Sequence, residues 1–459
     1  MRRAPALPSA RSRTATDGGS PATAVPNQRD AAARVAEKST TVLFVGYLVL
    51  ILVEYCGLAR NLLPFLLAIR FSTVLAYLLL LVILVRVGVG DLFQHRQTRI
   101  LAIFIVFTAA SVLWAVVQTY AFQAIRPMVD HTVFFVLTLT LVDRQRRIDA
   151  LSWAFVAVSA YVIARNLDKL GSATRTGVMV GGSFMGDGND FAWAMTVMLP
   201  IILNLMFGQR SWLERCGGLL GAGLCVIGIV GTSSRGAALA AAAMGLYYLF
   251  ALARRRTFTA VALAGIVGAV LVLAPSHYGE RLGSIAEYEE DNSAQARLQT
   301  WGAAIRMAVD YPLGVGADNF SSAYGRFYVP ESDDNRIGWG SGRWLSAHSI
   351  YFRTLGEYGV LGLGLLVWLI IGNVRDNVAV RKALTANPEL APVSPMWPGL
   401  LAMAVIGHAV GGVFLGGLPY LHLFLLAGLT VANKRLVASV TGPPPPRAGV
   451  RKSIHQKSP

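Results

Sequence analysis

The sequence predicts an all-α polytopic membrane protein with about 12 transmembrane helices. Hydrophobic residues fill 54% of the 459 positions, charged residues only 14%, and the mean hydropathy is +0.52. A soluble domain carries about 25% charged residues, so this chain lacks the polar surface that a water-soluble protein needs. A helix requires about 20 mostly apolar residues to cross a membrane, and apolar runs near that length recur along the chain.

The apolar runs give the order of the spans. We predict twelve of them, at residues 40–58, 67–87, 99–119, 127–143, 149–165, 190–208, 216–232, 236–253, 257–275, 349–373, 397–415 and 417–433. The fourth run is short, and only Gly416 separates the last two. Counts of eleven or thirteen spans therefore remain open.

Basic residues predict the orientation. With the N-terminus inside, the predicted cytoplasmic segments hold 27 of the 41 lysines and arginines, and the external segments hold 14. The positive-inside rule then favours a multi-pass plasma-membrane protein with both termini in the cytoplasm. The same distribution explains the net charge of +16 without a nucleic-acid partner.

Composition divides the chain further. Residues 1–39 and 434–459 are predicted to be disordered cytoplasmic tails, because they are basic and rich in small residues or proline. Spans one to nine occupy 40–275 and spans ten to twelve occupy 349–433. The segment 276–348 between them is predicted to be a large, partly helical external loop. The three cysteines form no CxxC motif, which argues against a zinc or iron–sulfur site.

The external loop has a composition of its own. Between residues 276 and 347 it carries ten acidic residues against six arginines, and it is rich in aromatic residues. Such a surface suits sugars and phosphates at a membrane. Leu298, Trp301, Ile305 and Ala308 follow helical spacing, so one face of this helix is expected to rest on the membrane or on the spans below.

Four polar segments stand out, and all are predicted at the outer face. The first holds Arg175 and then GDGNDFAWAM, with Asn189 and Asp190 at the start of span six. The second is GTSSRGA with Arg235, in a short turn between two spans. The third holds Arg297, Trp301 and the PLGVGADNF turn, and the fourth is SAHSIYFRTLGEYG, with His348, Tyr351, Arg353 and Glu357.

This set, in this order, resembles the O-antigen ligase and polymerase superfamily of bacterial membrane glycan-assembly proteins. The matching residues are Asn189–Ala192, Ser234–Gly236, Arg297 with Trp301 and Pro312–Gly316, and His348–Gly362. The twelve-span layout with one large late external loop agrees as well. One departure is Ser349, where the family more often has Asn.

The resemblance implies a glycosyltransferase-type ligase or polymerase. Such an enzyme takes an oligosaccharide from an undecaprenyl-diphosphate carrier at the outer side of the plasma membrane. It transfers the oligosaccharide to a hydroxyl of a glycan or lipid acceptor. Since the loop contains no Asp-x-Asp motif, we expect no metal and no other cofactor. An exopolysaccharide or cell-envelope polysaccharide polymerase is the favoured reading.

Residue chemistry agrees with that activity. Arginine forks bind phosphate oxygens bidentately, so Arg235 and Arg297 are predicted to hold the diphosphate, with Arg175 as a further contact. His348 is the predicted general base for the acceptor hydroxyl, on a face shared with Tyr351. The predicted substrate-binding residues are Arg175, Asn189, Asp190, Trp301, Tyr351 and Glu357.

Two other classes remain open. A transporter or flippase of lipid-linked sugars would need charged or broken helices near the membrane midplane, whereas the polar groups here gather at one face. A non-catalytic scaffold of the cell envelope would tolerate single arginine changes. Within the enzyme class, the residues do not distinguish ligase from polymerase.

Overall fold

A computed structural model describes residues 28–87, 89–170, 179–273, 292–329, 344–388, 393–416 and 420–441. In these ranges every regular element is helical and no β-strand occurs. The chain divides into two units between Val42 and Leu43. The described residues of the first unit form the beginning of helix α1 (Gln28–Cys56), and all other helices belong to the second unit.

Each predicted span coincides with a helix. Besides α1, these are α4 (Phe71–Val87), α6 (Arg96–Ser111), α7 (Gln118–Leu141), α8 (Gln145–Ala164), α9 (Gly188–Leu203), α10 (Trp212–Gly231), α11 (Arg235–Tyr247), α12 (Arg256–Leu273), α16 (Ile350–Ala386), α17 (Met396–Gly411) and α18 (Leu421–Thr441). Within the described ranges, seven helices are long and apolar enough to cross a membrane. The all-helical, multi-pass architecture is confirmed, whereas the number twelve stays a prediction.

The boundary between the third and fourth predicted spans is wrong. The third span was predicted at 99–119, but α6 already ends at Ser111, and α7 begins at Gln118 rather than nine residues later. A distant loop fixes this turn, since the Val116 amide donates to the Val315 carbonyl over 3.1 Å. Local hydropathy contains no trace of such a contact.

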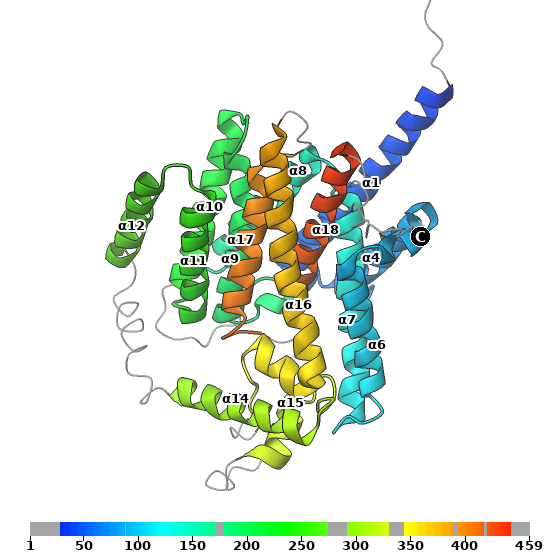
Figure 1. The fold of residues 1–459 in the computed structure, drawn as a ribbon, viewed down its shortest axis with the longest axis vertical. Helices are drawn as coiled ribbons and strands as arrows, with labels where there is room; N and C mark the ends of the chain where they lie inside the picture. The colour runs from blue at the N-terminus through cyan, green and yellow to red at the C-terminus, as the bar shows by residue number, and fades with distance from the viewer. Residues whose placement is uncertain are drawn as a thin grey trace, which may run out of the picture. The chain divides into compact units, whose positions relative to one another are not determined.

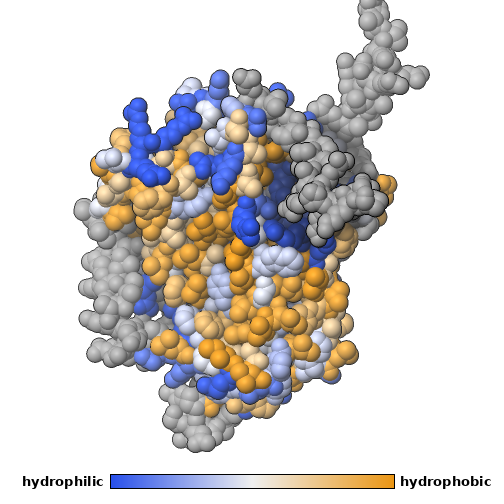
Figure 2. Space-filling view, viewed as in Figure 1, coloured by the Kyte–Doolittle hydropathy of each residue, from blue (hydrophilic) through white to orange (hydrophobic). Residues whose placement is uncertain are grey.

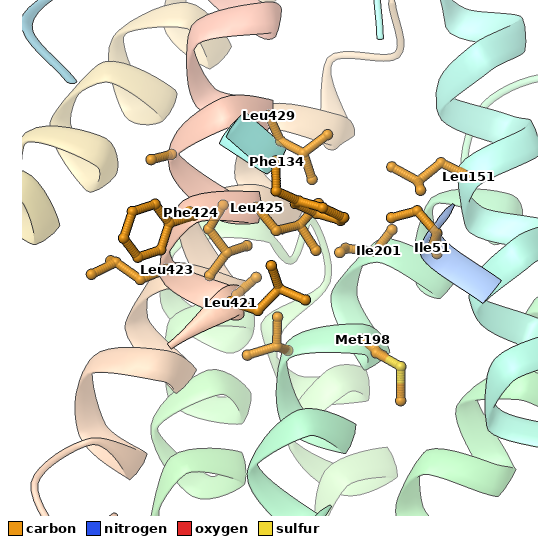
Figure 3. Close-up of a cluster of buried hydrophobic side chains, with 14 of the residues drawn as sticks. Ile51, Phe134, Leu151, Met198, Ile201, Leu421, Leu423, Phe424, Leu425 and Leu429 are labelled. Carbon is orange, nitrogen blue, oxygen red and sulfur yellow. The ribbon is translucent and has the colours of Figure 1, made fainter. Parts of the chain in front are cut away.

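Helix α9 forms the centre of the bundle. Residues 191–198 are all buried, and α9 contacts α8, α10, α11 and α17 (Figure 1). A helix that is apolar on every side is typical of a bundle interior. Figure 3 shows the neighbouring core, where Ile51 of α1, Phe134 of α7 and Leu151 of α8 meet α9 and α18.

The bundle has two ends of different character. We call the site end the one at which α9, α11 and α16 begin, and the opposite end the one at which α8 and α10 begin. At the opposite end, Arg210 pairs with Asp149 at 2.7 Å, and Arg96 of α6 pairs with Asp376 of α16 at 3.1 Å. These ion pairs join segments that are far apart in sequence.

Candidate functional site

The start of α9 supplies two polar side chains to the site end. Asp187 caps the helix, because its Oδ1 accepts hydrogen bonds from the amides of Asn189 (2.7 Å) and Asp190 (2.8 Å). An Asp in this position satisfies amides that lack partners in the first turn. The side chains of Asn189 and Asp190 are therefore left for other contacts.

Asn189 links the first and second predicted segments. Its Oδ1 accepts a hydrogen bond of 2.9 Å from the Ser234 hydroxyl. Ser234 immediately precedes α11, so Arg235 is the first residue of that helix and is half-buried there. The N-terminus of a helix carries a partial positive charge that favours anions. The adjacent Ser233 adopts a left-handed φ of 51°, which turns the chain sharply between α10 and α11.

The third segment lies on α14 (Asn292–Asp310). The indole Nε1 of Trp301 donates to the Ala347 carbonyl over 2.9 Å, and its ring stacks on Phe352 at 4.6 Å with 13° between the planes. Trp301 thus holds the segment that leads to His348. Arg297 lies one helical turn before Trp301 and is half-buried.

The PLGVGADNF turn docks onto a break in α16. Gly359 has φ 64° and ψ −166°, so the helix is interrupted there. The carbonyls of Gly356 and Glu357, which this break frees, accept the amides of Val315 (2.9 Å) and Gly316 (3.1 Å). A Cβ on Gly359 would lie 2.0 Å from the Pro312 carbonyl oxygen, so only glycine fits.

His348 stands just before α16. Helix α16 begins at Ile350, with Ser349 as its cap, and the Ser349 hydroxyl accepts the Phe352 amide at 3.5 Å. The prediction that His348 shares a helical face with Tyr351 is wrong, because His348 adopts a left-handed φ of 45° outside the helix. Its side chain is exposed. At Ser349, the hydroxyl supplies the cap that an Asn would also provide.

Charged groups from three segments surround His348. Removal of water by the surrounding protein lowers the pKa of His348 below its ordinary 6.5, even though part of the ring stays exposed, and the positive charge of Arg297 lowers it further. Arg353 acts in the same direction, while the carboxylate of Asp187 opposes both. Arg297, Asp187 and His348 are therefore electrostatic neighbours.

Two predicted substrate contacts instead make protein contacts in the structure. The Tyr351 hydroxyl donates to the Ala409 carbonyl over 2.8 Å, which ties α16 to α17. Glu357 is fully buried, and its Oε1 accepts the Arg353 Nε at 2.7 Å. Arg353 also bonds to Asp318 in the docked turn. These side chains hold the site end together, and a substrate contact for either stays a prediction.

Sequence reasoning missed two members of the site. Asp187 was overlooked beside the matching Asn189 and Asp190, although its place before a helix is an N-cap signal. Tyr420, just before α18, interacts with Asp190, and its ring lies 4.7 Å from that of Trp193. No sequence motif marks Tyr420, because it lies far along the chain from Asp190, just before a different helix. Arg175 lies outside the described residues.

The structure thus defines a class: a multi-pass helical membrane protein with arginines, a histidine and carboxylates gathered at one end of its bundle. Residues 220–367 match the family model for O-antigen ligase. That range runs from within α10 into α16 and includes Arg235, Arg297 and His348. No curated protein matches the chain. The match confirms the resemblance: over residues 220–367 the chain is similar to the O-antigen ligase family.

Proposed function

We propose that the protein transfers an oligosaccharide from an undecaprenyl-diphosphate carrier to an acceptor hydroxyl at the outer face of the plasma membrane. An exopolysaccharide or another cell-envelope polysaccharide is the favoured product. In this reaction the acceptor oxygen bonds to the anomeric carbon of the sugar. The bond from that carbon to phosphate breaks, and undecaprenyl diphosphate leaves with the electron pair.

One observation carries the proposal: groups suited to this reaction come from four distant segments and meet at the site end. Ser234 bonds to Asn189, Trp301 holds the backbone before His348, and Arg297 and Asp187 lie in the electrostatic surroundings of that histidine. Buried apolar packing alone gives no reason for this concentration of polar groups.

Two arginines are proposed to neutralise the leaving diphosphate. Arg235 opens α11, where the helix dipole adds to its own charge. Arg297 lies beside the segment that carries His348. A guanidinium keeps its proton and offers parallel donors to phosphate oxygens, so it stabilises the charge that develops as the bond breaks. Arg175 is proposed as a third contact.

His348 is the proposed general base. Its exposed ring can reach an acceptor, and its lowered pKa keeps it neutral, and so able to take a proton, at neutral pH. Asn189 and Asp190 are proposed to bind sugar hydroxyls, since amide and carboxylate oxygens accept hydrogen bonds from them. The reaction as proposed uses no metal.

The proposed topology places both termini in the cytoplasm and the site end outside.

The two other classes, a flippase and a scaffold, differ from the enzyme in one outcome each. A flippase moves the lipid-linked sugar and leaves it intact, and a scaffold neither moves nor cleaves it.

The test uses the purified full-length chain in lipid nanodiscs with an undecaprenyl-diphosphate oligosaccharide. We expect mass spectrometry to detect free undecaprenyl diphosphate together with a longer or newly attached glycan. A longer glycan on the carrier indicates a polymerase, and a glycan on a separate acceptor indicates a ligase. An intact donor after long incubation with acceptors of both kinds would contradict the proposal.

A further inference from the structure

Helix α14 has a second apolar face that the protein core does not use. Ala303, Ala304 and Met307 on one side are fully buried against residues of α15 (Phe320–Ala323) and the neighbouring turn. On the opposite side of the same helix, Leu298, Ile305 and Val309 have exposed fractions of 48%, 53% and 74%. Their spacing of seven and four residues places them in one stripe.

This stripe differs from the helical face predicted from the sequence. The prediction grouped Trp301 with Leu298 and Ile305 on one supporting face. In the structure Trp301 turns toward α16 and stacks on Phe352, whereas Leu298 and Ile305 point away from the core. The helix therefore rests on the protein along one side and presents an apolar stripe along the other.

The stripe continues into surface that the spans expose. Leu313 follows α14 and is exposed, and its neighbour Pro312 touches the break at Gly359. The next two residues of α16, Val360 and Leu361, are among its most exposed apolar side chains. Since α16 is a candidate membrane span, its exposed apolar side is the surface that meets lipid.

Figures 1 and 2 show how α14 is oriented and what surface surrounds it. In Figure 1, α14 lies across the end of the bundle, at a large angle to the long helix α16. In the same view, Figure 2 shows hydrophobic residues running from the flank of the bundle toward that end. An amphipathic helix that lies in the plane of a membrane surface has this orientation.

Polar and aromatic residues flank the stripe as a lipid interface requires. Gln299, Arg306 and Asp310 are exposed on one edge of α14, where they can meet headgroups and water. Arg306 can pair with lipid phosphate, while its guanidinium lies 5.8 Å from the Tyr328 ring. The rings of Tyr311, which directly follows α14, and of Phe327 are also exposed, and aromatic residues favour the interface.

We propose that α14 is a membrane-surface helix whose Leu298–Ile305–Val309 stripe inserts into the lipid leaflet at the site end. The occupant of this face is lipid, and not a second copy of the chain or another protein. Because α14 also carries Arg297 and Trp301, its insertion fixes the depth of both residues relative to the headgroups. This role is independent of the reaction proposed above.

The test is spin labelling of the full-length chain in lipid nanodiscs. Cys216, the exposed native cysteine, is replaced by serine, while Cys56 and Cys225 are buried. Single cysteines are then placed at Ile305, at Val309 and, as the matched control on the polar edge of the same helix, at Gln299. Collision of each label with oxygen, which concentrates in lipid, is compared with collision with a water-soluble nickel complex.

We expect the labels at Ile305 and Val309 to collide preferentially with oxygen, and the label at Gln299 to collide preferentially with nickel. Equal nickel access at all three positions would overturn the proposal, because the stripe would then face water. Protection of Ile305 and Val309 from both reagents would also overturn it, in favour of a second copy. An Ile305→Asp variant should raise nickel access at Val309, and an unchanged ratio would count against lipid insertion.

Discussion

The two ends of the bundle differ in how far backbone hydrogen bonds join their distant segments. At the opposite end, side chains make the long-range connections: Arg210 bonds to Asp149, and Asp376 receives both Arg96 and Lys434. At the site end, backbone groups make many of them. Val315 and Gly316 donate to α16 carbonyls, Ile350 donates to the Gly412 carbonyl, and Gly182 donates to the Tyr55 carbonyl.

This difference explains how side chains at the site end stay available for binding and catalysis. A backbone amide or carbonyl that holds a loop consumes no side chain, so Asn189 and His348 can face the site. An end that is tied together by its charged side chains has fewer of them left for a ligand. Mutations at the two ends should therefore affect different properties, and the predictions below use that contrast.

The largest effect is expected for His348→Asn. Asparagine tolerates the left-handed φ of 45°, so the fold should be kept while the base is lost. Removing a positioned base costs roughly 10²–10⁴-fold in rate. Transfer from the lipid-diphosphate donor is measured beside thermal melting, and a normal rate in a normally melting variant would remove His348 from the mechanism.

Gly359→Ala should destabilise the backbone contacts that hold the site end together. The added methyl group would collide with the Pro312 carbonyl at a φ that strains any side chain. Strain and overpacking each cost about 1–3 kcal/mol, so we expect a clearly lower melting temperature. Gly364→Ala on the same helix is the control, because its Cβ would meet open space. Equal melting of the two variants would show that the break is dispensable.

Arg235→Lys and Arg297→Lys test the bidentate contact with phosphate. Lysine keeps the charge and loses the fork. Losing one hydrogen bond to a charged group costs about 1.5–3 kcal/mol, which corresponds to roughly 10–150-fold in rate. Arg306→Lys, on the exposed edge of α14, should leave the rate unchanged. Full activity in both Lys variants would rule out the proposed role of the fork.

Arg210→Gln should show the smallest effect on chemistry. The Arg210 side chain is only 7% exposed and holds Asp149 and Glu214. Its loss leaves carboxylates partly buried without their cation, at a cost of about 1–3 kcal/mol in stability. Melting should fall, while the rate per folded molecule stays near that of the parent. Arg254→Gln, an exposed residue, is the stability control. A large loss of rate without a loss of stability would contradict the distinction drawn between the two ends.

Much of the fold could be predicted because the membrane spans of a protein are recognisable as apolar runs in its sequence. Every predicted apolar run became a helix, but the α6–α7 boundary depended on a contact between Val116 and Val315. Hydropathy describes the burial of a residue, whereas this boundary depends on which distant amide meets which carbonyl. Long-range backbone contacts of this kind leave no local pattern.

The candidate site could also be predicted only in part, because its long-range contacts leave no local sequence pattern. The motifs predicted that Asn189, Arg235, Arg297 and His348 lie at one end of the bundle, and in the structure they do. They did not indicate that Asp187 caps α9 or that Tyr420 reaches Asp190 from another connection. Nor did helical spacing reveal that His348 precedes its helix, since a single left-handed residue changes the direction of a side chain without changing the sequence pattern.

The pH dependence of transfer tests the central claim most directly. If neutral His348 removes the acceptor proton, the rate of the parent should fall as acid protonates the ring. The lowered pKa places that fall below pH 6.5. In His348→Asn the residual rate should lose this acid limb, since the titrating base is absent. An acid limb that persists unchanged in the variant would contradict the account, because another group would then carry the proton.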